Sequence, residues 1–473
     1  MRIAILGGGI TGLTAAFYAS RRFPDASITL FERTQRLGGI MGSVQARVGN
    51  TSIISDTGPR TIRANAPRAI VTLDLVHSLN LTPRMLLVRK RSPAASSRYV
   101  LSPRGHLLRI PTTAHLLPHA LPTAPAPPAS ASLLSSCLPL LRDPLFAPLL
   151  PALLRDALHP RIQRPPGTPD QSVRAFVARR WGARVAEGLA SAVVMGVWAG
   201  DPGRLSARAC VPGLWEAETR GVGWGGVVGA VCSGVGERVE GGLVGEVRSG
   251  EAGGVERELG MGEVSVYNFV GGMGAFVGAL EQAVRGRENV RVEVGADVER
   301  IEACSGGVEI AVNKCAPASR SFTHVIACTS LNHVLSATNH TAVLPIPRME
   351  EVTVMVVTLC YLKPFIHHPY HGFGYIIPRS VPHHMNPERA IGVVFDSDAL
   401  SGQDDFSGTK IAVMLGGCWW REMADYPSPD VATKMAKNVL KRHLGLRAEP
   451  ASAVTTLQRD AIPQYGSFAD ELS

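Results

Sequence analysis

The alternation of apolar and polar positions at the start of the chain predicts a strand, a helix and a second strand in close succession. Residues 2–6 form an apolar run that is too short and too rich in β-branched side chains to favour a helix. An alanine-rich amphipathic segment follows from Leu13 to about Arg22, and residues 27–31 predict a second strand that ends at Glu32. Because a glycine-rich turn joins the first strand to the helix, the pattern predicts the βαβ unit of a dinucleotide-binding, Rossmann-like fold.

The glycine-rich turn has the spacing Gly-x-Gly-x-x-Gly, which suits a bound dinucleotide. Gly7 permits the tight turn, Gly9 lets the backbone approach a pyrophosphate, and Gly12 lets helix and strand pack closely. The free N–H groups at the helix N-terminus favour phosphate. Glu32 follows Gly12 by 20 residues, where it would accept hydrogen bonds from ribose hydroxyls and disfavour the 2′-phosphate of NADP. We therefore predict that Gly7, Gly8, Gly9, Gly12 and Glu32 bind the cofactor.

The later hydrophobic pattern predicts a chain that crosses back and forth between domains. Helices are expected at 67–79, at 170–190 and at 273–285, and strands at 290–294 and 324–328 return to the cofactor-binding domain. Apolar runs from 352 to 415 predict a mostly β second domain. The expected segments are a cofactor-binding start at 1–90, a helical region at 91–215, a glycine-rich insertion or flexible loop at 216–263, the second part of the cofactor-binding domain at 264–335, and the β domain at 336–473.

Composition narrows the class of partner. A chain of 473 residues suits two or three domains. The formal net charge of +9 favours anionic surfaces or substrates. No basic run resembles a nucleic-acid-binding tail, and basic and aromatic residues do not alternate, so nucleic acid is not an expected partner.

Cysteine and histidine positions predict no metal site. The 8 cysteines are scattered without a Cys-x-x-Cys pair, which argues against zinc and a disulfide framework and favours a reducing compartment. His367, His368 and His371, and further on His383 and His384, lie beside prolines with no cysteine or carboxylate at ligand spacing. We interpret both groups as loop residues.

The segment at 111–169 is dominated by Pro, Ala, Leu and Ser. It has no stretch of about 20 uninterrupted apolar residues, so no membrane-spanning helix is expected. Two interpretations stay open: short apolar helices on a membrane surface, flanked by Arg142, Arg155 and Arg161, or a helical subdomain that buries its own leucines. We expect no cleavable secretory signal, because the first apolar run is a strand of the cofactor-binding fold.

The residues after Glu32 bear on the choice between FAD and NAD. Plain NAD-binding domains do not need the extension Arg33-Thr34-Gln35-Arg36-Leu37-Gly38-Gly39. It resembles the flavin-binding signature of the amine oxidase and desaturase superfamily, in which a second glycine pair approaches the flavin side of the cofactor. We therefore expect FAD, with Arg33, Arg36, Gly38 and Gly39 among its binding residues.

Further motifs, in order along the chain, resemble the protoporphyrinogen oxidase family within that superfamily. The Gly-Phe-Gly, Met-Leu-Gly-Gly and Ile-Pro-Gln-Tyr motifs are the most specific. The matching residues are 6–10, 36–39, 58–60, 196–201, 271–273, 372–375, 393–397, 413–417 and 462–465. The resemblance implies an α/β (α+β overall) chain, with a Rossmann-like FAD-binding domain, a mixed-sheet substrate domain and a helical membrane-docking subdomain.

The family's activity is implied for this chain by the same motifs. It is the oxidation of protoporphyrinogen IX to protoporphyrin IX in haem biosynthesis, in which hydride leaves a meso carbon for FAD and dioxygen is reduced to hydrogen peroxide. No acid–base pair is implied, because the flavin carries the redox chemistry. Monotopic attachment to the mitochondrial inner membrane and a homodimer are also implied by resemblance.

The resemblance assigns roles to particular residues. Arg98 matches the arginine that pairs with a substrate propionate, for which a guanidinium is well suited. Phe373 and Ile376 match the pair that packs against the macrocycle, and Met414 matches a residue near the reacting carbon. The cofactor-binding set is extended by Gly58, Pro59, Arg60 and Val298.

The C-terminal end departs from the family pattern. Family members continue past the Ile-Pro-Gln-Tyr motif with a strand, a glycine turn and a helix that closes the flavin site, whereas this sequence ends 8 residues after Tyr465. Weakened FAD binding is therefore expected. The alternatives to an active oxidase are a truncated, non-catalytic homologue and another FAD-dependent enzyme of the amine oxidase or desaturase type.

Overall fold

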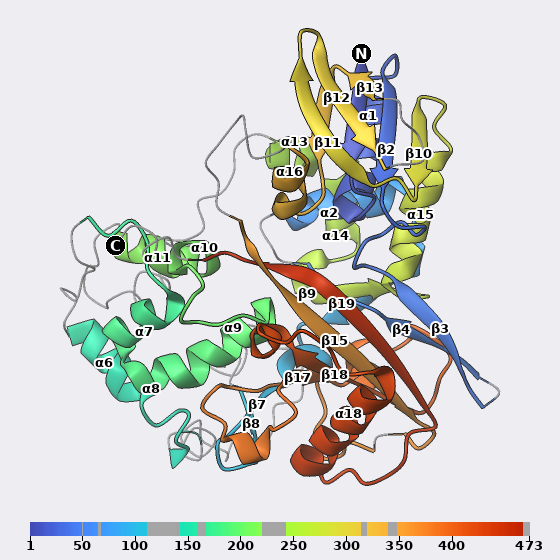
Figure 1. Ribbon diagram of the computed structural model, residues 1–473. Coiled ribbons are helices and arrows are strands. Elements are labelled where there is room, and N and C mark those ends of the chain that lie inside the picture. Colours follow the sequence, from blue (N-terminus) through green and yellow to red (C-terminus); the bar gives the residue numbers. More distant parts are fainter. Residues whose placement is uncertain are drawn as a thin grey trace. The chain divides into compact units, whose positions relative to one another are not determined.

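A computed structural model describes residues 1–49, 51–64, 68–110, 140, 142–158, 167–219, 243–313, 319–338, 348–364 and 366–466 (Figure 1). The chain forms two compact units, each assembled from segments that are far apart in sequence. Unit 1 contains Met1–Leu87, Gly242–Met349 and Gly402–Phe406, and unit 2 contains Val88–Gly241, Glu350–Ser401 and Ser407–Ser473. These bounds differ from the expected segments at several places: residues 242–263, 336–349 and 402–406 belong with unit 1, and residues 88–90 belong with unit 2.

Unit 1 is built on a four-stranded parallel sheet with the order β10-β2-β1-β14. The strands are β1 (Arg2–Leu6), β2 (Ser27–Glu32), β10 (Val290–Val294) and β14 (His324–Ala327), and helix α1 (Ile10–Arg22) follows β1 directly. Leu6 of β1 pairs with Phe31 on one side and with Ala327 on the other. The βαβ unit predicted from the hydrophobic pattern is therefore confirmed.

Different layers cover the two faces of this sheet, because alternate residues of a strand project to opposite sides. Ile3 and Ile5 pack in a core with α1, α2 (Ala69–Ser78) and α15 (Met273–Arg285). Leu6 instead packs in a second core against the antiparallel sheet of β11 (Val298–Cys304), β12 (Gly307–Val312) and β13 (Arg320–Phe322). Further elements of unit 1 are β3 (Ser43–Val48), β4 (Thr51–Asp56), β5 (Ile62–Arg63), η1 (Thr82–Arg84), η3 (Met261–Glu263), β9 (Val264–Phe269) and α16 (Leu331–Ala337). Strand β6 (Met85–Arg89) begins in unit 1 and ends in unit 2.

The glycine-rich segment predicted to be an insertion or flexible loop contains two helices in its described part. These are α13 (Leu243–Ser249) and α14 (Glu251–Glu258), and α14 packs against α2. Ala252 and Val255 are buried in the core of unit 1. The glycines masked the helical spacing of these apolar residues, so the loop expectation was wrong for 243–258; residues 220–242 lie outside the described part of the chain.

Unit 2 contains a seven-stranded mixed sheet with the order β19-β15-β18-β17-β16-β7-β8. Only the β16–β7 pair is parallel among the pairs of this sheet. The strands are β7 (Arg98–Leu101), β8 (Leu107–Arg109), β15 (Glu350–Tyr361), β16 (Gly374–Ile376), β17 (Ala390–Val394), β18 (Thr409–Gly416) and β19 (Ser452–Gln464). The mixed-sheet second domain expected from the sequence is confirmed.

The two faces of this sheet carry different elements. Helix α18 (Pro429–Leu444) packs on one face against alternate residues of β15 such as Met355 and Val357. On the other face, Met195 of α9 (Ser191–Trp198) packs against Val354 and Val356. Each face therefore has its own hydrophobic core.

A helical layer completes unit 2. It contains α6 (Leu149–Leu158), α7 (Val173–Trp181), α8 (Ala183–Val185), η2 (Ala186–Ala190), α9, α10 (Ala207–Cys210) and α11 (Pro212–Thr219). The short helix α3 (Pro93–Ser96) contacts α17 (Asp396–Ala399) instead. The single helix predicted at 170–190 is interrupted at Gly182, whose φ of 91° lies in the left-handed region. Fully buried Arg180 pairs with Asp156 of α6 and Glu218 of α11, which ties three helices together. Within the described residues, no helix is both long enough and apolar enough to cross a bilayer; residues 111–139 and 159–166 of the proline-rich segment lie outside that part of the chain.

Candidate functional site

The glycine turn between β1 and α1 is shaped by backbone contacts. Gly7, with φ of 100°, donates its N–H to the carbonyl of Phe31 at 2.8 Å. A Cβ on Gly12 would lie 1.8 Å from the carbonyl oxygen of Gly7, so helix and turn pack as closely as a glycine allows. Gly9 caps α1 with no side-chain hydrogen bond to the helix within the described residues, and a Cβ there would meet nothing nearer than Gly39 at 4.0 Å. The N-terminus of α1 thus offers its N–H groups to a phosphate.

The second glycine pair lies directly beside this turn. The N–H of Gly38 donates to the carbonyl of Gly8 at 2.8 Å, and Gly9 and Gly38 form a parallel bridge. The exposed Arg36 holds the pair in place, because its guanidinium donates to the carbonyls of Leu37, Gly39 and Met41. Gly9 and Gly39 approach each other closely, since a Cβ on Gly39 would lie 3.2 Å from the Cα of Gly9. The two turns therefore meet through backbone alone, and a surface without side chains suits the close approach of a pyrophosphate.

Glu32 is oriented by the same turn. Its Oε2 accepts the N–H of Gly8 at 2.8 Å, and its Oε1 accepts the N–H and hydroxyl of Thr34 at 2.8 and 2.7 Å. A carboxylate offers about four lone-pair positions, so one acceptor site on Oε2 stays available to a ribose hydroxyl. The side chain is buried, and it is held where the motif requires it.

The other predicted cofactor residues also belong to unit 1. Arg33 is exposed in the loop after β2. Gly58 and Pro59 follow β4, and buried Arg60 donates to the carbonyl of Gly58 at 3.3 Å. Val298 begins β11 and is buried in the core that contains Leu6. Their contacts to a cofactor stay predictions.

The sequence pattern did not single out Asp56, which organises the segments around the N-terminus of α15. Oδ1 of this fully buried carboxylate accepts the hydroxyl of Ser43 at 2.6 Å and the N–H of Met273 at 2.9 Å. Oδ2 accepts the side-chain amides of Asn268 at 3.3 Å and Gln403 at 2.7 Å. A carboxylate at the N-terminus of α15 stabilises that helix. The sequence feature that could have pointed to this residue is the Ser-Asp pair at the end of β4, just before the Gly-Pro-Arg turn.

Three of the four predicted substrate residues project from one face of the seven-stranded sheet in unit 2. Arg98 of β7 pairs with Gly374 of β16. Two residues further along β16, Ile376 pairs with Gly392 of β17, and Gly392 pairs in turn with Met414 of β18. Because paired residues on neighbouring strands project to the same side, Arg98, Ile376 and Met414 share a face. The two glycines contribute no side chain between them.

The fourth predicted residue, Phe373, lies against the same face. The Arg98 guanidinium carbon lies 5.5 Å from the centre of the Phe373 ring, and Phe373 packs with Met414 against a cluster that includes Val394 and Ala412. The Phe373 backbone is fixed on both sides, because its N–H donates to Ser97 at 2.9 Å and its carbonyl accepts from Phe395 at 3.0 Å. Arg98, Phe373 and Met414 therefore lie together, whereas Ile376 lies on the same face but packs in a separate cluster with Val100 and Phe146.

Three of the matching segments, 196–201, 413–417 and 462–465, meet at the end of α9. The N–H of Cys418 donates to the carbonyl of Ala199 at 2.7 Å, and the Gln464 side chain donates to the carbonyl of Trp198 at 2.9 Å. Asp201 pairs with Arg379 beside them. Although burial alone would raise it, the pKa of Asp201 is held below its ordinary value by the N–H of Gly203 and by Arg379.

These observations define a class. Unit 1 has the glycine turn, the second glycine pair and the acidic residue of a domain that binds a dinucleotide, and unit 2 presents a mixed apolar and cationic face. That combination is typical of an FAD-dependent oxidoreductase with a separate substrate domain.

Comparison with known proteins identifies the family. The chain belongs to the flavin containing amine oxidoreductases, whose family model matches residues 10–470. It is 27% identical over 479 residues to the protoporphyrinogen oxidase of Schizosaccharomyces pombe, and 29% identical over 476 residues to that of Homo sapiens. Each alignment covers 98% of this chain and 88% of the relative. The protein is therefore an FAD-dependent oxidoreductase.

Solved structures confirm the fold. A candidate protoporphyrinogen oxidase from Exiguobacterium sp. 255-15 superimposes with a TM-score of 0.70 at 21% identity, covering 100% of this chain and 89% of that one. Cyclohexylamine oxidase from Brevibacterium oxydans IH-35A superimposes with a TM-score of 0.59 at 17% identity, covering 99% and 89%. At these identities the likeness establishes the fold alone.

Proposed function

We propose that this protein oxidises protoporphyrinogen IX to protoporphyrin IX, using FAD and dioxygen and releasing hydrogen peroxide. The observation that carries the proposal is the gathering of Arg98, Phe373, Ile376 and Met414 on one face of the substrate sheet. Relatives named protoporphyrinogen oxidase, aligned over almost the whole chain, support it.

The chemistry of this face suits a broad apolar ring that carries carboxylates. Phe373, Ile376 and Met414 are half-buried and apolar, and Gly374 and Gly392 leave the sheet surface without side chains between them. Exposed Arg98 supplies a cation at the edge, where a bidentate guanidinium would bind a propionate. When bound, FAD accepts the electrons that leave the substrate and passes them to dioxygen. The residues of unit 2 bind and orient the ring and keep water from it.

The direct test is turnover by the purified chain supplied with FAD. We expect porphyrin fluorescence to appear only when both dioxygen and protoporphyrinogen IX are present, with hydrogen peroxide formed alongside. A parallel assay with putrescine or cyclohexylamine separates this function from amine oxidation. Turnover of an amine with none of the porphyrinogen would contradict the proposal, and so would a flavin-loaded protein that oxidises neither.

We also infer that helix α6 associates with a membrane surface, which would accord with the mitochondrial inner membrane location implied by the family resemblance. Leu150, Leu154 and Leu158 form a stripe at i, i+4 and i+8, with side chains 47, 54 and 70% exposed, whereas Asp156 is fully buried. Beside the stripe, a groove of about 550 Å³ is lined by prolines, Trp181, Arg155 and Arg184. Exposed leucines flanked by arginines favour an interface with anionic lipids.

Sedimentation with vesicles that contain an acidic phospholipid tests this inference. The triple substitution Leu150→Ser, Leu154→Ser and Leu158→Ser should weaken binding at least about tenfold, because it removes most of the exposed apolar stripe. Leu362→Ser is a matched control, since Leu362 is 66% exposed elsewhere in unit 2. Equal binding by the triple variant and the wild type would contradict the inference.

A further inference from the structure

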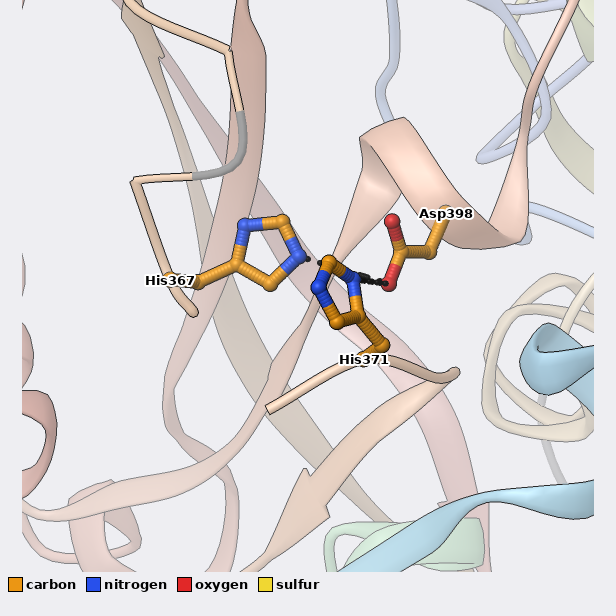
Figure 2. A group of neighbouring side chains, drawn as sticks. All are labelled: His367, His371 and Asp398. Carbon is orange, nitrogen blue, oxygen red and sulfur yellow. Dashed lines mark hydrogen bonds and ion pairs between the residues drawn. The ribbon is translucent and has the colours of Figure 1, made fainter. Parts of the chain in front are cut away.

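Two histidines and an aspartate converge close to one another in unit 2 (Figure 2). His367 and His371 belong to the segment before β16, and Asp398 belongs to the short helix α17 (Asp396–Ala399). Oδ2 of Asp398 lies 3.3 Å from Nε2 of His367 and 3.4 Å from Nδ1 of His371. The sequence offered the His-x-x-x-His spacing but no nearby carboxylate, and the fold supplies one from 27 residues beyond His371.

We propose that His367, His371 and Asp398 form a binding site for a divalent transition-metal ion of the zinc class. Two imidazoles and one carboxylate, with water completing a tetrahedron, are a ligand set that such ions take. With bonds of about 2.0 Å, two ligands of a tetrahedral ion lie about 3.3 Å apart, which matches both distances to Asp398. Among the described residues, this is the group of three such side chains whose ligand atoms all lie within 4.8 Å of one another.

The surroundings orient two of the three ligands. The N–H of Gly372 donates to Oδ2 of Asp398 at 2.8 Å, which fixes the carboxylate and leaves the oxygen a second lone pair. The fully buried ring of His367 stacks on Phe395 with 4.8 Å between ring centres. The His371 ring is 39% exposed, so it has room to move toward the other two ligands. Its exposure also lets solvent reach the fourth coordination position of a bound ion.

The second nitrogen of His367 limits the affinity of the proposed site for a metal ion. Nδ1 of His367 is buried and has no hydrogen-bond partner among the described residues. A metal on Nε2 leaves the ring proton on Nδ1, and ligating histidines whose second nitrogen is hydrogen-bonded bind about 10 to 100 times more tightly than those without such a partner. We therefore expect an exchangeable site with a dissociation constant of the order of micromolar, not a tightly held structural ion.

Calorimetric titration of Zn²⁺ into the full chain, supplied with FAD and freed of metal by dialysis, tests the site. The wild type should bind one equivalent that Asp398→Asn and His371→Gln lose or bind at least about tenfold more weakly. His384→Gln is the matched control, because His384 is an exposed histidine of the other pair and should leave that equivalent unchanged. X-ray absorption of the zinc-loaded wild type should give nitrogen and oxygen ligands at about 2.0 Å.

The alternative is a cluster that only anchors the segment to α17 through hydrogen bonds and ion pairs. A wild type that binds no Zn²⁺ more tightly than about 100 µM would overturn the proposal, since weaker binding is common to surface histidines. The proposal would fail equally if Asp398→Asn and His371→Gln both bound as many equivalents as the wild type with equal affinity. Because His371 is half-exposed, its variant keeps the test open even where the aspartate variant fails to fold.

Discussion

The glycine turn of unit 1 and the proposed substrate face of unit 2, which carries Arg98, Phe373, Ile376 and Met414, are built on opposite principles. The turn is made of backbone: Gly7, Gly9 and Gly12 matter because they lack side chains, and a single Cβ on Gly12 would strike a carbonyl at 1.8 Å. The face is made of side chains that project from strands fixed by their neighbours, such as Arg98 and Met414. A change in the glycine turn should therefore abolish FAD binding. A change on the face should alter the affinity for the proposed substrate and leave the fold intact.

The substitution Gly12→Val is the sharpest test of whether the glycine turn depends on the absence of side chains. The new side chain cannot be accommodated unless the turn between β1 and α1 moves, and backbone clashes of this kind cost at least about 4 kcal/mol. We expect flavin absorbance per chain to fall below about a tenth of the wild-type value with added FAD. Gly278→Val is the control, since a Cβ at Gly278 in α15 would meet nothing within 4 Å. If Gly12→Val kept full flavin, the close approach would not matter.

Asp56→Asn should have the next largest effect, a loss of folding stability. The carboxylate accepts four hydrogen bonds. An amide replaces one of its two acceptor oxygens with an NH2 group, which donates and so cannot pair with the two donors that faced that oxygen. Two buried donors left unpaired lower the free energy of unfolding by about 3 kcal/mol. Urea unfolding and an FAD titration measure the loss. Asp25→Asn, at an exposed position, should change neither, and equal stability of both variants would refute the role of Asp56.

On the substrate face, Arg98→Ala should change affinity alone. Loss of a charge-assisted contact of about 2 kcal/mol raises KM for protoporphyrinogen IX roughly 30-fold, with little change in kcat and none in flavin absorbance. Arg109→Ala is matched, because Arg109 pairs with Tyr99 and so projects from the opposite side of the sheet. An Arg98 variant with unchanged KM would show that this arginine makes no contact with a propionate.

The smallest effect is expected on the α18 side of the same sheet. His443 accepts the hydroxyl of Tyr375 on Nδ1 at 3.0 Å and donates from Nε2 to the carbonyl of Met385 at 2.8 Å. Burial, and then the charge of Arg442, hold the pKa of His443 below its ordinary 6.5. Below pH 6.5 the unfolded chain binds a proton that the folded chain excludes, so stability should fall as the pH falls.

His443→Gln should remove this part of the pH dependence. The difference in urea midpoint between pH 7.5 and pH 5.5 should be smaller in the variant than in the wild type, while KM for the substrate stays as in the wild type. A variant with the wild-type pH dependence would show that His443 is not the titrating group.

The same comparison explains what the sequence could predict. The predicted cofactor turn is contiguous, so spacing and hydrophobic pattern were enough to predict the tight turn at Gly7, Gly9 and Gly12 and the place of Glu32 beside it; their contacts to a cofactor stay predictions. The substrate face is assembled from β7, β16 and β18, and only sheet register reveals that Arg98 and Met414 share a side; residue type alone could not, so resemblance had to select them.

Other features escaped because they depend on the tertiary structure. Asp56 caps a helix that begins 217 residues later, and Asp398 joins His371 only in the fold. In α14, Ala252 and Val255 pack in a core, yet the surrounding glycines weakened the helical signal that would have predicted it.

Anaerobic mixing of the FAD-loaded protein with protoporphyrinogen IX is the most decisive test of the proposed oxidation. We predict that the flavin band near 450 nm, about one flavin per chain, bleaches on mixing and returns when dioxygen is admitted, as porphyrin fluorescence rises. Arg98→Ala should need roughly 30-fold more substrate for half the bleaching. A protein that stays colourless with added FAD, or whose flavin band is unchanged by the porphyrinogen, would refute the proposed function.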